Sequence, residues 1–101
     1  MAEYMCLVKK EKASEAERKL RMDFDVAARQ SITIRDPAAL GVKELNGIIF
    51  YITGSDEGVH KCKELLKEFV HEAKSELLEK AKHKIKEEED RAAAGFGGIF
   101  G

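Results

Sequence analysis

The chain has 101 residues, the usual size of one domain, and its 44% hydrophobic content is enough for one modest core. Its 18 Lys and Arg nearly balance its 19 Asp and Glu, which leaves a formal net charge of -1. This balance argues against a protein that holds nucleic acid or an anionic membrane chiefly through a basic surplus. No apolar run approaches the roughly 18 residues that a membrane helix needs, and residues 1–10 lack the pattern of a secretory signal. We therefore expect a cytoplasmic location without membrane insertion.

The residue types that usually carry catalysis or bind metal are few and poorly spaced. The two cysteines, Cys6 and Cys62, lie inside apolar patterns and far apart in the sequence, which is typical of buried, reduced thiols. The three histidines, His60, His71 and His83, lack the closely paired spacing of zinc ligands. We therefore expect no metal site, no cofactor and no catalytic residue, and we interpret the chain as a non-enzymatic protein.

The first predicted elements are a strand and a helix. Residues 4–8 form a short apolar run, which predicts a buried strand or, alternatively, the start of the first helix. Ser14 and Glu17 have the S-x-x-E spacing of a capping box. Apolar residues then recur at helical spacing: Ala16, Leu20, Phe24 and Ala27. The sequence thus predicts a helix that continues to Gln30, with Phe24 on its core side.

A second strand and a short turn follow. Residues 31–35 alternate polar and apolar side chains, so they should form a half-exposed strand with Ile32 and Ile34 toward the core. Residues 36–37, Asp-Pro, can cap a brief helical turn that Gly41 ends.

The next predicted strand is the most apolar part of the sequence. The dipeptide Asn46-Gly47 suits the positive φ angles of a type I′ turn, so it predicts a tight hairpin into this strand. Residues 48–52 carry large apolar side chains on both faces, which favours a central position in the sheet. Ser55 can then cap the helix that follows.

A long amphipathic helix is predicted for the last part of the fold. Its apolar stripe consists of Val59, Cys62, Leu66, Phe69, Ala73 and Leu77. Beyond these, only Ala81 and Ile85 continue the stripe. An unbroken helix over residues 56–90 would be about 50 Å long, more than a domain of this size can cover. We therefore expect residues 79–90 to project, with Ala81 and Ile85 available to a partner.

The last residues differ in composition from the rest. Residues 91–101 combine four glycines with Phe96, Ile99 and Phe100. Glycine gives the backbone freedom, whereas apolar side chains have little reason to occur in a purely solvating tail. We interpret this segment as a flexible Gly/Phe-rich tail that inserts Phe96, Ile99 and Phe100 into a partner's pocket. The alternative is a loose end that folds back over its own core.

One part of the sequence is similar to a known family. Residues 48–70, IIFYITGSDEGVHKCKELLKEFV, resemble the last strand and helix of a KH domain, in which the strand ends in I-x-G and the helix begins with an acidic residue. Cys62 takes the small-residue place of that helix, and Leu65-Leu66 the paired apolar one. The resemblance implies a βαββα topology. The GXXG loop with which KH domains grip nucleic acid does not occur before Arg35, so we assign no RNA-binding residue.

These patterns together predict an α+β fold. A small sheet of three or four strands would pack on two helices in the order β-α-β-β-α, as one domain over residues 1–90. The leading interpretation is an accessory or regulatory protein that docks on a larger protein or complex, or on a second copy, through its long C-terminal helix and Gly/Phe tail. The alternative is a degenerate KH-like RNA-binding domain that uses the basic residues in 18–21 or 80–86 and binds RNA in a salt-dependent manner.

Overall fold

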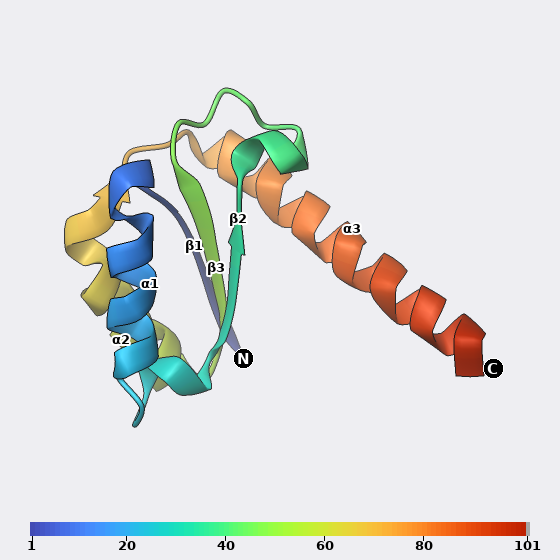
Figure 1. The fold of residues 1–101 in the computed structure, drawn as a ribbon, viewed down its shortest axis with the longest axis horizontal. Helices are drawn as coiled ribbons and strands as arrows, with labels where there is room; N and C mark the ends of the chain where they lie inside the picture. The colour runs from blue at the N-terminus through green and yellow to red at the C-terminus, as the bar shows by residue number, and fades with distance from the viewer. Residues whose placement is uncertain (101) are drawn as a thin grey trace.

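A computed structural model describes the backbone of residues 1–100 and the side chains of residues 1–91. The strands in this range are β1 (Ala2–Val8), β2 (Ser31–Arg35), β3 (Ile48–Gly54) and β4 (Val70–His71), and the α-helices are α1 (Ala13–Met22), α2 (Asp56–Leu66) and α3 (Ser75–Phe100) (Figure 1). Short 3₁₀ turns lie between them: η1 (Lys10–Lys12), η2 (Ala27–Arg29), η3 (Pro37–Leu40) and η4 (Lys67–Phe69). The predicted α+β class is confirmed, with three α-helices in the described chain where two were expected.

The strands form one antiparallel sheet in the order β2-β3-β1-β4. β3 pairs with β2 on one side and with β1 on the other, so its predicted central position is confirmed. β1 pairs with β3 from Ala2 opposite Gly54 to Val8 opposite Ile48. The N-terminal apolar run is therefore a strand and not the start of a helix.

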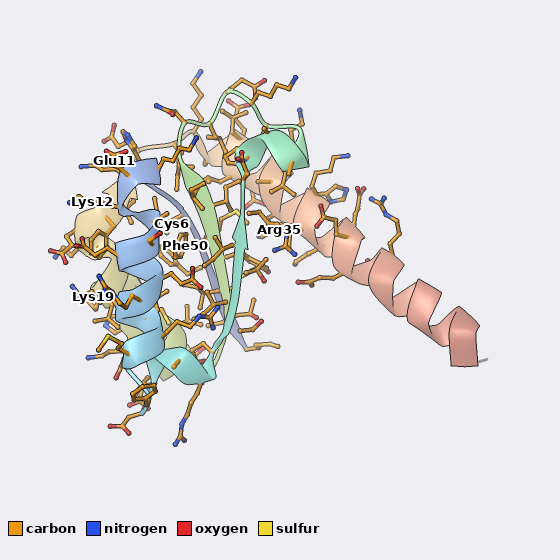
Figure 2. All side chains as sticks on the ribbon, viewed as in Figure 1. Cys6, Glu11, Lys12, Lys19, Arg35 and Phe50 are labelled. Atoms are coloured by element: carbon orange, nitrogen blue, oxygen red, sulfur yellow. The ribbon has the colours of Figure 1, made fainter. Side chains whose placement is uncertain are left out.

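Each face of the sheet has its own core. α1 and α2 cover one face, whereas α3 runs obliquely across the other face and then leaves the sheet (Figure 1). Phe50 and Cys6 belong to the first core, on the side of α1 (Figure 2). Ile49 and Tyr51 belong to the second core, which α3 and the segment around η3 complete. Successive residues of β3 point to opposite faces, which explains why this strand is apolar throughout.

The prediction of a single helix over residues 56–90 is wrong. α2 ends at Leu66, and β4 then pairs with the end of β1 before α3 begins at Ser75. The apolar stripe that looks continuous in sequence is divided between the two cores. Val59, Cys62, Leu66 and Phe69 lie in the first core, and Ala73, Leu77, Ala81 and Ile85 in the second. The chain thus crosses from one face of the sheet to the other at the edge formed by β4.

The predicted extent of the first helix is also wrong. α1 begins after Lys12, without a side-chain cap from Ser14, and it ends at Met22 rather than at Gln30. The carboxylate of Asp23 accepts a hydrogen bond from the Ala27 N–H at 3.2 Å, and this local bond competes with continuation of the helix. As a result, Phe24 is not in the core but is 73% exposed.

The turns around β3 combine confirmed and corrected predictions. Asp36 caps η3 by accepting from the Ala38 N–H at 2.9 Å, and Gly41 ends it with a left-handed φ of 77°. The prediction of a tight hairpin at Asn46-Gly47 is wrong, because η3 and an irregular segment connect β2 to β3. Gly47 instead allows a close approach of strands: a Cβ there would lie 2.5 Å from the carbonyl oxygen of Val8.

The predicted cap of α2 is confirmed. The Ser55 side chain accepts a hydrogen bond from the Gly58 N–H at 3.0 Å, and Asp56 and Glu57 occupy the first turn. Negative charge at this end of a helix is favourable because it complements the helix dipole.

Candidate docking surface

The first turns of α3 are fixed to the sheet by apolar contacts. Ala81 is 0% and Ile85 1% exposed, and both pack in the second core with Leu77 and Leu78 alongside. The two residues predicted from the sequence to meet a partner are therefore covered by their own chain. A partner could reach Ala81 and Ile85 only if α3 left the sheet.

The other predicted docking residues are Phe96, Ile99 and Phe100, in the segment interpreted as a flexible tail, and the backbone of this segment continues α3 as far as Phe100. They lie outside the residues whose side chains the structure describes. Their insertion into a partner's pocket stays a prediction.

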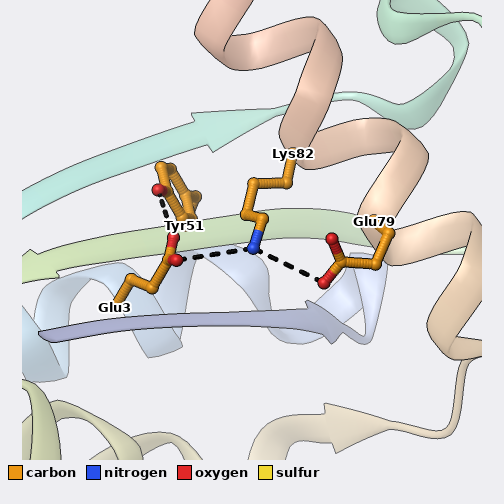
Figure 3. Close-up of polar contacts among 4 residues, drawn as sticks. All are labelled: Glu3, Tyr51, Glu79 and Lys82. Atoms are coloured by element: carbon orange, nitrogen blue, oxygen red, sulfur yellow. Dashed lines mark hydrogen bonds and ion pairs between the residues drawn. The ribbon is translucent and has the colours of Figure 1, made fainter.

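A polar cluster fixes α3 to the sheet beside these apolar contacts (Figure 3). The Tyr51 hydroxyl donates to the Glu3 carboxylate at 2.6 Å. The Lys82 ammonium lies 3.4 Å from Glu3 and 3.4 Å from Glu79. Because Glu3 is on β1, Tyr51 on β3 and Lys82 on α3, the cluster joins three elements that are far apart in the sequence.

The cluster shifts the acid–base properties of its members. The hydrogen bond from Tyr51 is the largest influence on Glu3 and holds its pKa below the ordinary value. Desolvation opposes this shift, and the charge of Lys82 adds to it. Burial, together with the bond to Glu3, raises the pKa of Tyr51 to about 12. At neutral pH the pair therefore consists of a carboxylate and a neutral phenol. This arrangement stabilises the contact and leaves neither group poised for proton transfer near pH 7.

A second ion pair, between exposed side chains, joins α3 to the sheet nearly two turns beyond Lys82. The Arg35 guanidinium, at the end of β2, extends toward α3 (Figure 2) and lies 3.5 Å from the Glu88 carboxylate. Beyond this point, α3 runs away from the sheet (Figure 1). The fold thus holds the first half of the helix firmly and aims the rest away from the domain.

The departing turns of α3 present a predominantly acidic surface. Residues 86–91 carry four acidic and two basic side chains, all exposed or half-exposed. Glu87 lies at the centre of an ion-pair network, 3.1 Å from His83, 3.7 Å from Lys84 and 3.9 Å from Arg91. Such pairs contribute little to stability, but they order the exposed face of the helix.

A groove of about 370 Å³ lies between these turns and the uncovered end of the sheet. Hydroxyl and charged groups line it: Glu3, Ser31, Thr33, Thr53, Lys86 and Glu89. Met1, Ala2 and Tyr51 complete its lining, so the groove offers both hydrogen-bonding groups and apolar contacts. Sequence patterns did not reveal this groove because its walls come from β1, β2, β3 and α3.

The cysteines have the properties of core residues. Both are free thiols, and Cys6 is 3% and Cys62 0% exposed. Burial raises the pKa of Cys6 to about 12 and also raises that of Cys62. These thiols are therefore protonated at neutral pH, which makes them poor nucleophiles.

The described part of the chain contains neither a candidate metal site nor a helix suited to a membrane. In that part of the chain, no three His, Cys, Asp or Glu side chains come together as a metal-binding group. No helix there is long and apolar enough to cross a membrane.

Comparisons of the chain with protein-family models, with curated proteins and with solved structures give no match.

Proposed function

We propose that the chain is a non-enzymatic accessory or regulatory protein that docks on a larger protein complex through the far half of α3 and the Gly/Phe tail. The observation that supports this proposal is the mismatch between helix and sheet. α3 has 26 residues, which corresponds to about 39 Å, yet among its described side chains, residues 75–91, the apolar contacts with its own sheet end at Ile85. A helix that extends beyond its own domain presents a surface that a partner can bind.

The rigid attachment of α3 would favour such binding. The second core, the cluster around Lys82 and the pair between Arg35 and Glu88 fix the direction of the helix before a partner arrives. A preorganised element loses less conformational entropy on binding than a flexible one. Phe96, Ile99 and Phe100, on the last turns of α3, would then supply apolar burial.

The acidic character of residues 86–91 indicates the chemistry of the partner. Four acidic and two basic side chains in this segment would favour a basic surface next to an apolar pocket. The same surplus of acid repels phosphates, which argues against the alternative of RNA binding through residues 80–86. Association with the partner should therefore weaken as the salt concentration rises.

A pull-down from the cells of origin tests this function. We would compare the full chain with a variant that lacks residues 95–101, and with a variant of full length in which Phe96, Ile99 and Phe100 are serine. Each chain would be used with nuclease-treated and with untreated extract, and the proteins recovered would be identified by mass spectrometry. The proposal predicts a stoichiometric protein complex that survives nuclease and is lost in both variants. Recovery of only nuclease-sensitive ribonucleoprotein would favour the RNA-binding alternative, and equal recovery by all three chains would exclude a role of the tail.

A further inference from the structure

The sheet has a largely unpaired edge at β1. β4 covers this strand only at Leu7, opposite His71, and at Val8, opposite Val70. On that side, residues 2–6 have no strand partner in the described chain. An unpaired edge presents backbone donors and acceptors that can template a further strand.

The direction of these backbone groups follows from the neighbouring hydrogen bond. The Lys9 N–H donates to the carbonyl oxygen of Phe69 at 3.1 Å, so Lys9 points toward the β4 side. Because backbone groups alternate between the two sides of a strand, Leu7, Met5 and Glu3 point the same way. Of these, Leu7 meets His71, and the N–H and C=O groups of Glu3 and Met5 are left for another strand.

At the opposite edge of the sheet, a side chain occupies one outward backbone group. At β2, the Arg35 guanidinium donates to the carbonyl oxygen of Ile34 at 2.9 Å, and this bond occupies an acceptor of that edge. Among the described side chains, none is hydrogen-bonded to the backbone of Glu3 or Met5. The outward backbone groups of Glu3 and Met5 are thus all available, whereas one of those on β2 is occupied.

Space for side chains lies on both faces of this edge. A hollow of about 640 Å³ extends beside β1 between Met5 and the segment 70–74, with Leu78 in its wall. On the other face, a hollow of about 370 Å³ is lined by Tyr4, Val70 and the side chains of α2 around Lys63. An added strand could therefore place alternate side chains in either hollow.

We propose that β1 pairs in antiparallel orientation with β1 of a second copy of this chain, about a two-fold axis at Tyr4. In this register Glu3 lies opposite Met5 of the second copy, and Met5 lies opposite its Glu3. All outward backbone groups of both residues are then satisfied. Tyr4 meets Tyr4 of the second copy at a position without hydrogen bonds, where side chains are closest and aromatic pairs are favourable.

A second copy fits this edge because the proposed register is self-complementary. Glu3 and Met5 are placed symmetrically about Tyr4, so one rotation satisfies both chains and closes the assembly. Glu3 does not face another carboxylate directly, and Lys82 of its own chain already lies 3.4 Å from it. The formal net charge of -1 adds little repulsion between copies. The result is one continuous sheet across two chains, with both α3 helices on the same face.

Sedimentation analysis over a range of protein concentrations tests this pairing, with Met5→Pro as the main variant. Proline removes the outward N–H of Met5 while leaving the bonds between β1 and β3 in place. The matched control is Met5→Val, which keeps the N–H and an apolar side chain. We expect a dimer for the parent chain and for Met5→Val, and dissociation constants at least about 10-fold higher for Met5→Pro. A monomer at all concentrations, or an equally stable dimer of folded Met5→Pro, would overturn the proposal.

A cross-linking experiment remains decisive even if Met5→Pro does not fold. In a chain with Cys6 and Cys62 replaced by alanine, Tyr4→Cys would place two thiols opposite each other with Cα atoms about 4.5 Å apart, within disulfide range. Glu3→Cys is the control, because its thiols would lie diagonally on the other face. Rapid interchain oxidation of Tyr4→Cys, and much slower oxidation of Glu3→Cys, would support the register. Equal rates, or cross-linking of neither variant, would contradict the proposed pairing. Binding of unrelated peptides at β1, without any self-association of the chain, would contradict it as well.

Discussion

The hydroxyl of Tyr51 donates a 2.6 Å hydrogen bond to the carboxylate of Glu3, across the boundary between β3 and β1. The two residues are diagonal neighbours on the face that α3 covers, because Tyr51 pairs with Met5 and Glu3 with Thr53. Lys82 extends the contact from the sheet to α3. A single polar contact thus links the pairing of two strands to the position of the helix that we propose as the docking element.

Removal of the Tyr51 hydroxyl should weaken this link. We expect Tyr51→Phe to lower the free energy of unfolding by about 1–2 kcal/mol at pH 7, because a hydrogen bond to a charged group is lost. Urea unfolding measures the change. Tyr4→Phe is the control, since the Tyr4 hydroxyl has no carboxylate partner among the described residues, and its effect should stay within about 0.5 kcal/mol. Equal losses in both variants would contradict the role assigned to Tyr51.

The same contact predicts how stability depends on acid. The pKa of Glu3 is lower in the folded chain than its ordinary value of 4.5, so the folded state favours the carboxylate. Its contribution is present above that ordinary value and is lost as the pH falls through the folded pKa. The difference in stability between the parent chain and Tyr51→Phe should therefore shrink below about pH 4. A difference that stays constant from pH 7 to pH 3 would contradict this account.

Alkaline unfolding tests the raised pKa of Tyr51. The unfolded phenol ionises near its ordinary value of 10, whereas the folded one does so at about 12. The contribution of the neutral Tyr51 hydroxyl to the free energy of unfolding is therefore fully present below pH 10 and is lost as the pH rises toward 12. Tyr4 and Cys6 shift in the same direction, so Tyr51→Phe should reduce the alkaline loss without abolishing it. Denaturant melts at pH 9 and pH 11 would measure the difference, and an identical loss in both chains would exclude the shift.

Local sequence patterns predicted the elements whose signals lie within a few residues. The apolar strand β3, the cap of α2 at Ser55 and the turn closed by Gly41 all follow from short-range chemistry. The break after Leu66 does not, because apolar spacing continues through it. It depends on pairing of Val70 and His71 with β1, at the other end of the chain.

The candidate docking surface was only partly predictable for the same reason. The sequence identified Ala81 and Ile85 as the apolar face of a helix. It did not show that this helix packs on the second face of its own sheet. Gly47 likewise suggested a tight turn, whereas its role depends on the distant carbonyl of Val8. In each case the missing information was a tertiary neighbour.

Ile85 provides a test of the attachment of α3. Because Ile85 is 1% exposed, Ile85→Ala should lower the free energy of unfolding by about 2–4 kcal/mol through lost burial and a cavity. The adjacent Lys84→Ala is the control and should change it by less than about 0.5 kcal/mol. Chemical denaturation measures both. A small effect of Ile85→Ala would mean that α3 does not pack on the sheet in solution.

Two glycines separate steric conflict from backbone strain. Gly47→Ala would bring a Cβ to 2.5 Å from the Val8 oxygen, so we expect a loss of about 3 kcal/mol from overpacking and an unfavourable φ. Gly41→Ala also places a side chain at positive φ, in the left-handed helical region at 77°, but no atom lies within 4 Å of the added Cβ. It should cost only about 1 kcal/mol. Thermal unfolding of both variants would reveal the difference, and equal losses would argue against a close approach at Val8.

Photo-cross-linking from α3 tests the central claim most directly. A photoreactive phenylalanine analogue would replace Asp90, on the departing turns of α3, or Glu57, which is exposed on α2 on the opposite side of the sheet. After irradiation in the cells of origin, cross-linked proteins would be identified by mass spectrometry. Our account predicts one main protein partner linked through position 90 and none in common through position 57. Cross-links that are absent from position 90, or that are the same from both positions, would contradict it.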